Sequence, residues 1–477
     1  MTTRRLRTPE AGTVVIVLLV LLHAWWSARL QWDIHRGLGT SSYDVGLYDQ
    51  GVWLLSRFKA PFVTLMGRNL MGDHASFVLL FVVPLYWVIP GTETLLALQA
   101  IVIAAGALPL YAFARRRLRS QPMAVLLAGV WLLNPALNGA NMENFHPDSF
   151  LALFLSLALW ALMERRWRTF AVAVVLCATV KEDVSLVLVP LGVLVALKGE
   201  TRRGVLTVLG AVLASLTGMF LVMKPLIGVA TRNGWRIPFG GVKGFIKESV
   251  TNPGAVWRYL TSEGRLFYLW QMFSPFGFVF LLAPEVALVS GLVVLGNIVS
   301  TFWYQFHIGY HYSLVAVPAL AFATVVGVSR LHRNSRPVAV AVVVTCSLLG
   351  AYSWTALPQA RHQLGHWPAS NPVAVAARDI IKNVPDDAVV AVYHALAPHM
   401  AHRERIYQFP NPFRVVLYGT DISKEGSRDP AADTVEYVVL PLNMDADMAK
   451  DWASIAGDFR TVARNDSWGV WKRATGS

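Results

Sequence analysis

The stretch of this 477-residue chain best equipped for chemistry lies between residues 43 and 53, directly after the first long apolar run. It holds two carboxylates, one amide and three aromatic side chains. A carboxylate at a membrane surface can act as a general base that removes the proton of an acceptor hydroxyl. Asp44 is the first candidate for that role and Asp49 the second. Tyr43, Gln50 and Trp53 are expected to shape the substrate site around them.

A structural role is the alternative for both aspartates. The sequence predicts a short helix over residues 45–58 in an otherwise solvated loop. An aspartate just before a helix can accept hydrogen bonds from its free backbone N–H groups. Asp44 stands at such a helix-capping position.

Histidines and carboxylates recur further along the chain. His74 follows Asp73, and His146 and Asp148 lie in the sequence ENFHPD of residues 143–148. Neutral imidazole and carboxylate suit divalent ions, but no HExxH or comparable spacing supports a metal site. Satisfied polar contacts near the membrane interface explain each residue better, and Pro147 could simply open the next helix. The sequence thus establishes no cofactor and leaves a divalent metal open.

A third group of residues is suited to holding an anionic phosphate. Lys181 could bind the phosphate while Glu182 or Asp183 orients it, although a salt-bridge cluster at the membrane interface is the alternative. A later segment rich in Gly and Pro adds further cations. The residues predicted to bind phosphate are Lys181, Arg232, Arg236 and Lys243.

Two later positions are expected to border the same site. His311 lies at the outer end of another apolar run and is expected to help shape the acceptor side. Arg403 lies in the sequence PHMAHRERIYQFP of residues 398–410 and is expected to cover the site. The alternative for Arg403 is a connection between a helix and a strand with ordinary surface charge.

The composition indicates that these residues belong to a membrane protein. The chain is 55% hydrophobic and only 15% charged, whereas a soluble protein carries about 25% charged residues. Apolar runs of roughly 20 residues, the length that spans a bilayer, recur through the first three quarters. The formal net charge of +13 comes largely from short basic loops that set topology, and nothing indicates a nucleic-acid partner. Both cysteines lie in apolar runs, which argues against disulfides.

The basic residues also predict the topology. Arg4 and its basic neighbours place the N-terminus in the cytoplasm. If residues 76–89 do not cross the membrane, every later basic cluster falls inside, and about eleven transmembrane helices result. One of these spans is expected over residues 266–283. The outer loop 31–93 then carries the acidic sequence, and the other polar clusters gather on the same side.

The composition changes after residue 354. Residues 355–477 are expected to form a small extracytoplasmic α/β domain, with a helix over 373–382 and strands over 388–393, 436–440 and 467–472. Residues 1–354 form the transmembrane domain.

Taken in order, these sequences resemble a known group. They comprise residues 43–53 with the pattern YDxGxxxQxxW, His74, Phe-His-Pro at 145–147, Lys-Glu-Asp at 181–183, and residues 402–410. The set is similar to an uncharacterised prokaryotic family of polytopic membrane proteins that is grouped with the GT-C superfamily of glycosyltransferases. The resemblance implies a GT-C-like transmembrane domain and an active site between membrane and exterior. It also implies a polyprenyl-phosphate sugar donor, inversion at the sugar carbon, and Asp44 as the key acidic residue of the first outer loop.

The predicted function is therefore a multi-pass plasma-membrane glycosyltransferase. It would act on an envelope glycan, glycolipid or protein as acceptor. Two other functions stay open. One is a transporter or flippase of lipid-linked intermediates, although such proteins often show repeats and mid-membrane sites that this chain lacks. The other is a non-catalytic protein of envelope assembly.

Overall fold

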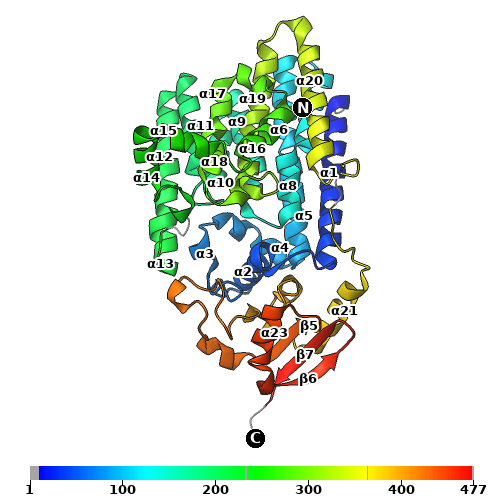
Figure 1. Ribbon diagram of the computed structural model, residues 1–477. Coiled ribbons are helices and arrows are strands. Elements are labelled where there is room, and N and C mark those ends of the chain that lie inside the picture. Colours follow the sequence, from blue (N-terminus) through cyan, green and yellow to red (C-terminus); the bar gives the residue numbers. More distant parts are fainter. Residues whose placement is uncertain (1–9, 231–233, 362–363, 475–477) are drawn as a thin grey trace, which may run out of the picture.

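The computed structural model describes residues 10–230, 234–361 and 364–474. Arg4 and its basic neighbours lie outside these residues, as does Arg232. A bundle of helices forms one end of the molecule, and a β-sheet forms the other (Figure 1). Short helices from residues 42–86 fill the space between them. The chain thus consists of a helical body, an intermediate layer and a small sheet.

The helical body is built from apolar helices. Six of those in the described part of the chain are long and apolar enough to cross a bilayer. They are Ala11–Arg36, Thr92–Leu118, Gln121–Glu143, Thr201–Ile227, His311–Arg330 and Arg333–Trp354. Four shorter apolar helices join them. These are Pro147–Met163, Trp167–Ala178, Ser185–Leu197 and Pro284–Val299.

Helix α1 (Ala11–Arg36) shows why these sequences form a bundle. Its buried residues Ile16, Val20, Ala24 and Ser27 recur every three or four positions and form one stripe. The opposite face exposes apolar side chains such as Leu18. A helix that is apolar all round but buried on one stripe is suited to face protein on one side and lipid on the other.

One predicted span is not a continuous helix. Over residues 266–283 the structure has α16 (Arg265–Phe273), followed by two short 3₁₀ turns. Pro275 enters the first turn, and Gly277 and Phe278 adopt left-handed conformations with φ of 55° and 58°. Such residues break a helix. The predicted number of eleven spans is therefore not confirmed, although each other predicted span overlaps an apolar helix.

The intermediate layer contains the acidic sequence. The turn η1 (Ser42–Gly46) leads into α2 (Leu47–Ser56), within the predicted range of 45–58. Gly46 occupies the capping position of α2, and no side chain caps that helix end. The capping role considered for Asp44 is therefore wrong. Residues 76–89 form only η2 (Phe77–Phe81) and α4 (Val83–Tyr86), which are too short to cross a membrane.

The five-stranded sheet has the order β4-β3-β5-β7-β6. The central strand β5 (Tyr437–Pro441) pairs in parallel with β3 (Val390–Val392), which pairs in parallel with β4 (Ile406–Gln408). On its other side, β7 (Trp468–Arg473) and β6 (Phe459–Arg464) continue the sheet in antiparallel fashion. Helices α21 (Pro372–Ile380) and α23 (Ala446–Ala453) accompany it. The three predicted strands and the predicted helix overlap β3, β5, β7 and α21, whereas β4 and β6 were not predicted.

Candidate active site

A cavity of about 440 Å³ lies where the helical body meets the intermediate layer. Eight of the residues predicted from the sequence line it. They are Tyr43, Asp44, His74, His146, Asp148, Lys181, Arg236 and His311. They come from segments as far apart in sequence as residues 43 and 311, so the fold brings the separate polar clusters into one place.

Most of these residues stand where a helix begins or ends. His146 precedes the turn η3 (Pro147–Ser149), and His311 opens the turn η10 (His311–Ala316). Lys181 lies in the connection between α10 (Trp167–Ala178) and α11 (Ser185–Leu197). Helix ends leave unpaired backbone groups and tolerate polar side chains. This is why a largely apolar body can present a polar site at one end.

Asp44 has an unusual backbone. Its φ of 64° lies in the left-handed region, and its ψ of −101° is outside every helical conformation. Residues held in such conformations cost free energy and cluster at functional sites. The Asp44 side chain remains 39% exposed, toward the cavity. The turn therefore directs a carboxylate into open space.

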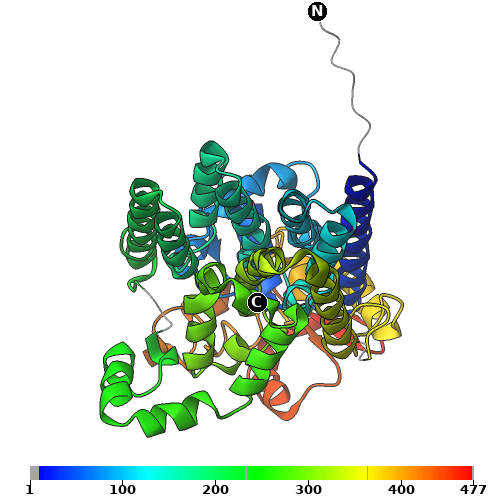
Figure 2. The same ribbon diagram turned by 90° about the horizontal axis from the view of Figure 1, so that it is seen from above.

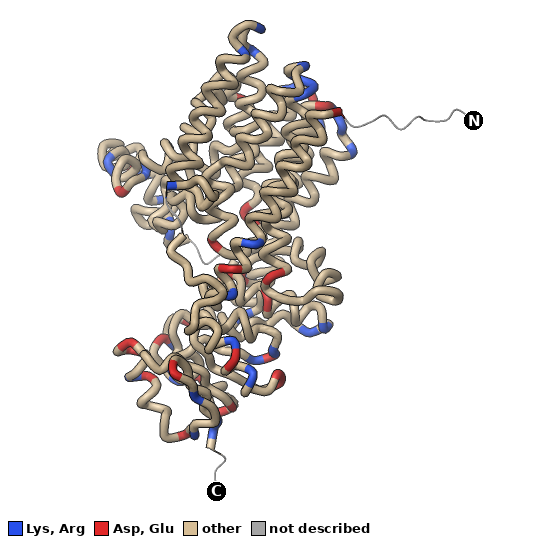
Figure 3. The backbone as a smooth tube through the Cα atoms, turned by 90° about the vertical axis from the view of Figure 1, so that its right-hand side faces the viewer, with Lys and Arg blue, Asp and Glu red and all other residues tan. Residues whose placement is uncertain are grey.

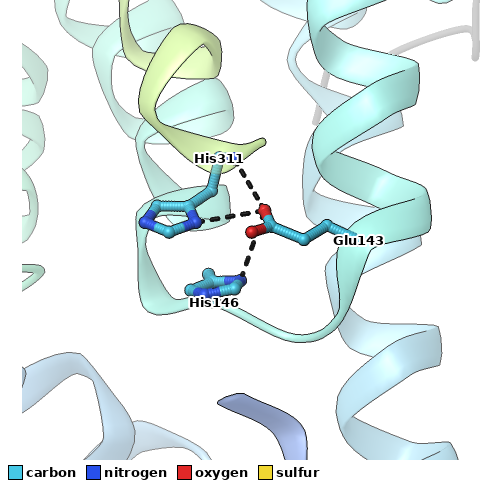
Figure 4. Close-up of side chains that lie close together, drawn as sticks. All are labelled: Glu143, His146 and His311. Atoms are coloured by element: carbon cyan, nitrogen blue, oxygen red, sulfur yellow. Dashed lines mark hydrogen bonds and ion pairs between the residues drawn. The ribbon is translucent and has the colours of Figure 1, made fainter. Parts of the chain in front are cut away.

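Asp44 belongs to a cluster with Glu143, His146 and His311. One Asp44 oxygen lies 3.2 Å from Nε2 of His146. Nδ1 of His146 lies 3.8 Å from Oε2 of Glu143, and Nδ1 of His311 lies 3.1 Å from the same oxygen (Figure 4). The two imidazole rings stack with centroids 3.7 Å apart. Two carboxylates thus hold two stacked histidines between them.

The charges in this cluster alter its titration. Burial alone would raise the pKa of the Asp44 carboxyl, but the His146 ring outweighs burial and holds that pKa below its ordinary value. Burial disfavours the charged His146 ring, yet Glu143 and Asp44 outweigh burial and raise its pKa to about 9. Asp44 is therefore ionised at neutral pH and available to accept a proton.

Lys181 forms the second charged cluster. Its ammonium lies 3.6 Å from Asp148 and 3.8 Å from Asp183, and 5.8 Å from the centre of the Tyr312 ring. Burial disfavours the charged amine, but Asp148 and Asp183 outweigh burial and raise the pKa of Lys181 well above its ordinary value. Lys181 therefore stays charged, and it lines the first cavity.

His74 forms an ion pair with Glu182, the residue that follows Lys181. Nδ1 of His74 lies 2.9 Å from Oε1 of Glu182, whose second oxygen accepts the Ala75 N–H at 3.1 Å. Glu182 does not line the cavity, whereas His74 does. The pair fixes the connection that carries Lys181 against the intermediate layer.

Arg236 differs from the other cations of the cavity. Its guanidinium donates to the Tyr312 hydroxyl at 3.4 Å and lies 4.1 Å from the centre of the Phe302 ring. Its Nε is buried and has no hydrogen-bond partner among the described residues. No carboxylate of those residues forms an ion pair with it, whereas Arg68 pairs with Asp73 at 2.7 Å. Arg236 therefore brings an unneutralised charge to the cavity.

A second cavity of about 650 Å³ adjoins the first, and Asp44 lines both. Its wall contains Glu143 and several residues with hydrogen-bonding or aromatic side chains. These are Asn138, Asn144, Gln271, His307, Tyr310 and Trp354. Asp44 thus lies between a cavity that contains three cations, Arg68, Lys181 and Arg236, and a cavity to which the described residues contribute no Lys or Arg.

The structure places Asp49 away from both cavities. Asp49 is buried, with only 1% of its surface exposed. Its carboxylate oxygens accept hydrogen bonds from the Tyr86 hydroxyl at 2.6 Å and from the Thr92 hydroxyl at 2.9 Å. Nε2 of His402 lies 3.1 Å from it. Asp49 therefore links the C-terminal segment to the intermediate layer through His402.

Five other predicted residues of the described chain line neither cavity: Gln50, Trp53, Asp183, Lys243 and Arg403. Gln50 is buried and donates to Thr64 and to the Arg403 carbonyl, and Trp53 stacks on His402. Arg403 is buried and donates to the carbonyls of Pro385 and Ala388, so it does not cover the site. Lys243 is exposed on α14 (Val242–Thr251), and Arg232 lies outside the described residues.

The sequence interpretation missed several residues that line the first cavity. They include Tyr48, Arg68, Trp235, Phe302 and Tyr312. It also did not single out Glu143, although Glu143 opens the ENFHPD sequence. Glu143 lies three positions before His146, and this spacing was a usable signal. Glu143 is the last residue of α8, and His146 lies in the loop that follows. Aromatic residues carry no comparable signal in a chain this rich in them.

Comparison with known proteins identifies the family and the fold of this chain. A family model described as "Predicted membrane protein (DUF2079)" matches residues 34–476. The fold is similar to a crystal structure of ArnT from Cupriavidus metallidurans bound to undecaprenyl phosphate, with a TM-score of 0.58 and 15% identity over 95% of this chain and 97% of that one. The apo state of the same protein gives a TM-score of 0.56 and 14% identity over 97% and 98% of the two chains. No curated protein matches. The predicted grouping with the GT-C fold is thus confirmed.

Proposed function

This chain belongs to the DUF2079 family of predicted membrane proteins, and we propose that it is an inverting glycosyltransferase of the GT-C type. The proposed donor is a sugar linked to a polyprenyl phosphate. The proposed acceptor is a hydroxyl of an envelope glycan, glycolipid or protein on the outer side of the plasma membrane. One observation carries the proposal: an ionised carboxylate, Asp44, and an unneutralised guanidinium, Arg236, border the same cavity of a GT-C fold.

The first cavity is the proposed site of the donor phosphate. Guanidinium groups bind phosphate through paired, charge-assisted hydrogen bonds, and Arg236 has a buried N–H free to form one. Lys181 lies across the same cavity and adds a second positive charge. Placing cations where charge develops on the leaving phosphate lowers the barrier to transfer. The lipid phosphate in the similar ArnT crystal structure belongs to the same chemical class.

The second cavity is the proposed entrance for the acceptor. Its amide, imidazole and phenol side chains suit a sugar or another polyol, which needs many hydrogen bonds. Because Asp44 lies between the two cavities, it can take the proton of the acceptor hydroxyl as that oxygen attacks the sugar carbon. The bond from that carbon to the phosphate oxygen then breaks on the opposite face, which inverts the carbon.

The remaining cavity residues have proposed supporting roles. His146 and His311 hold Asp44 and Glu143 in place, and Asp148 and Asp183 orient the Lys181 ammonium. Tyr43 donates its hydroxyl to the Leu417 carbonyl at 2.8 Å, so the C-terminal segment closes one side of the donor cavity. Asp49 is proposed to position that segment rather than to act as a base.

Sugar transfer by the purified protein is the direct test. The protein is placed in lipid nanodiscs with a radiolabelled polyprenyl-phosphate sugar and the envelope glycan missing from a deletion strain. Asp44→Asn is expected to lower the transfer rate by about 10²–10⁴-fold, the usual contribution of a general base. The matched control is Asp421→Asn, an exposed aspartate of the C-terminal region, which is expected to transfer at the wild-type rate.

Two results would contradict the proposal. Equal rates for wild type and Asp44→Asn would show that Asp44 is not the base. If wild-type protein moved the labelled lipid between vesicle leaflets without ever transferring the sugar, the transporter function would replace the transferase.

A further inference from the structure

Glu143, His146 and His311 bring their ligand atoms within 4.8 Å of one another, deep beside the junction of the two cavities (Figure 4). The three side chains are largely buried, with between 6% and 10% of each exposed. They come from the end of α8 (Pro135–Glu143), the following loop and the start of η10. We propose that these three residues bind a divalent metal ion, with zinc as the best-suited ion.

The donor set and its spacing fit zinc. Two imidazole nitrogens and one carboxylate, with a fourth position open, form a common type of catalytic zinc site. In a tetrahedral site with bonds of about 2.0 Å, neighbouring ligand atoms lie roughly 3.3 Å apart. Oε2 of Glu143 lies 3.1 Å from Nδ1 of His311 and 3.8 Å from Nδ1 of His146. Binding of one ion by all three atoms would require the two imidazole rings, which stack at an angle of 20°, to turn toward it.

One of the three proposed ligand atoms has no hydrogen-bond partner among the described residues. It is the buried Nδ1 of His146. Buried polar atoms without partners are rare and call for an explanation such as a bound ion or water. This nitrogen faces Glu143 (Figure 4), the place where an ion would lie.

The surroundings of the three residues also match those of metal ligands. A histidine that binds a metal through one nitrogen usually donates its other N–H to a carboxylate, which fixes the ring. Nε2 of His146 lies 3.2 Å from Asp44. The His311 backbone N–H donates to Glu143 at 2.7 Å, which holds the carboxylate against the histidines before any ion binds. Both ligand orientations are thus set by the protein.

The position of the ion suggests its task, which rests on the proposed transferase function. His146 and His311 line the first cavity, Glu143 lines the second, and Asp44 lines both. An acceptor hydroxyl bound at the open position would have a lowered pKa. Its proton would pass to Asp44 while its oxygen bonds to the sugar carbon and the phosphate leaves with the electrons of the broken bond.

Metal content can be measured without any sugar transfer. The full-length protein is purified without chelators, loaded with zinc, desalted, and analysed by mass spectrometry for zinc per chain. The zinc dissociation constant is then measured by competition with a chromophoric chelator. We expect about one zinc ion per chain, bound about 100-fold more weakly in His311→Gln and Glu143→Gln. The control is His307→Gln, a histidine four positions from His311 that is outside the cluster, and it should bind zinc as the wild type does.

A second measurement uses only the wild-type protein, so it does not depend on whether the variants fold. Zinc X-ray absorption of the wild-type protein should show two imidazole ligands, further nitrogen or oxygen ligands, and no sulfur. Absence of stoichiometric zinc, retention of zinc in both ligand variants, or a spectrum without two imidazoles would each overturn the proposal. Transfer by a zinc-free protein would overturn only the proposed task of the ion, and an inactive protein that still binds zinc would contradict only the transferase function.

Discussion

Arg236 shows how a single residue can define what a cavity binds. Its charge enters the cavity without a carboxylate partner among the residues that the structure describes, and its neighbours are the rings of Phe302 and Tyr312. We expect Arg236→Gln to raise the dissociation constant for a polyprenyl phosphate by about 10–100-fold, because a charge-assisted hydrogen bond contributes about 1.5–3 kcal/mol. Binding is measured in nanodiscs by displacement of a labelled polyprenyl phosphate.

Lys243→Gln is the matched control for Arg236→Gln. It removes a positive charge close to Arg236 in the sequence, but from an exposed position on α14 outside the cavity. We expect it to leave binding unchanged. Equal weakening by both substitutions would show that general attraction of the lipid phosphate, rather than the cavity, accounts for the effect.

The pair of His74 and Glu182 makes stability depend on pH. Burial would raise the pKa of Glu182, but His74 outweighs burial and lowers it from 4.5 to about 2. That stabilisation is present above about pH 4.5 and is lost as the pH falls toward 2. Burial would lower the pKa of His74, but Glu182 outweighs burial and raises it above 6.5. That stabilisation is full below pH 6.5 and is lost as the pH rises through the raised value.

The pair should therefore stabilise the protein most between about pH 4.5 and 6.5. Thermal unfolding in detergent should show that Glu182→Gln lowers the midpoint by a few degrees at pH 5.5 and by less at pH 9. In a double-mutant cycle with His74→Gln, the coupling should shrink at the higher pH. A coupling that stays constant across this range would show that the two side chains do not interact as ions.

At the residue scale, the sequence predicted eight of the side chains that line the first cavity, but it also assigned to the site residues such as Asp49 and Arg403 that lie elsewhere. Asp44, His146 and Lys181 were predicted because ionisable residues at membrane ends are costly unless they are solvated or used. Arg236 was predicted as one of several cations in a segment rich in Gly and Pro. Asp49 has the same chemistry and sequence neighbourhood as Asp44, yet hydrogen bonds with Tyr86 and Thr92 enclose it. Only the three-dimensional contacts separate the two aspartates.

Among the elements, α8 shows how close packing positions the site. A Cβ atom added at Gly139 would lie 2.3 Å from the Ile308 carbonyl oxygen and 2.8 Å from Cα of Gly309. Gly139→Ala must therefore push away the loop that leads into His311. We expect a loss of about 1–3 kcal/mol in stability, typical of an overpacked contact, measured by thermal or denaturant unfolding in detergent.

Gly129→Ala tests whether that loss comes from the contact. Gly129 lies in α7 (Gln121–Leu133), in the same apolar segment as Gly139, and an added Cβ would meet nothing within 4 Å. Alanine favours a helix over glycine by roughly 1 kcal/mol, so this variant should be as stable as the wild type or slightly more so. If both variants unfolded at the same midpoint, the packing against residues 308–309 would not matter.

The elements that sequence patterns predicted well are those with a strong local signal. The long apolar helices follow from length and composition, and β3, β5 and β7 follow from buried runs of β-branched or aromatic residues. The strand β4 is short and directly follows the charged residues 403–405, and β6 is exposed over most of its length, so neither has a clear pattern. The helix breaks after α16 because Pro275 lies in a 3₁₀ turn and Gly277 and Phe278 adopt left-handed backbone conformations. A left-handed Phe278 has no signal in the local sequence.

For the whole molecule, the distribution of charge indicates the orientation in the membrane. Lys and Arg gather at the end of the bundle where α1 begins (Figure 3), and the view along the bundle shows its helices side by side (Figure 2). Ion pairs join neighbouring helix ends there, with Arg115 at 2.8 Å from Glu10 and Arg165 at 2.9 Å from Glu200. Both cavities lie at the opposite end, next to the sheet. Such a basic end is typical of a cytoplasmic face.

Two engineered cysteines test this orientation. Ser335 is exposed between α19 (Val317–Arg330) and α20 (Arg336–Trp354) at the basic end, and Ser454 is exposed next to the sheet. In a Cys346→Ala background, with Cys177 buried, a membrane-impermeant maleimide should label Ser454→Cys on intact spheroplasts. It should label Ser335→Cys only after permeabilisation, as it does a cytoplasmic marker protein. The reverse pattern would place both cavities in the cytoplasm, and a donor in the outer leaflet could then no longer reach Asp44 and Arg236.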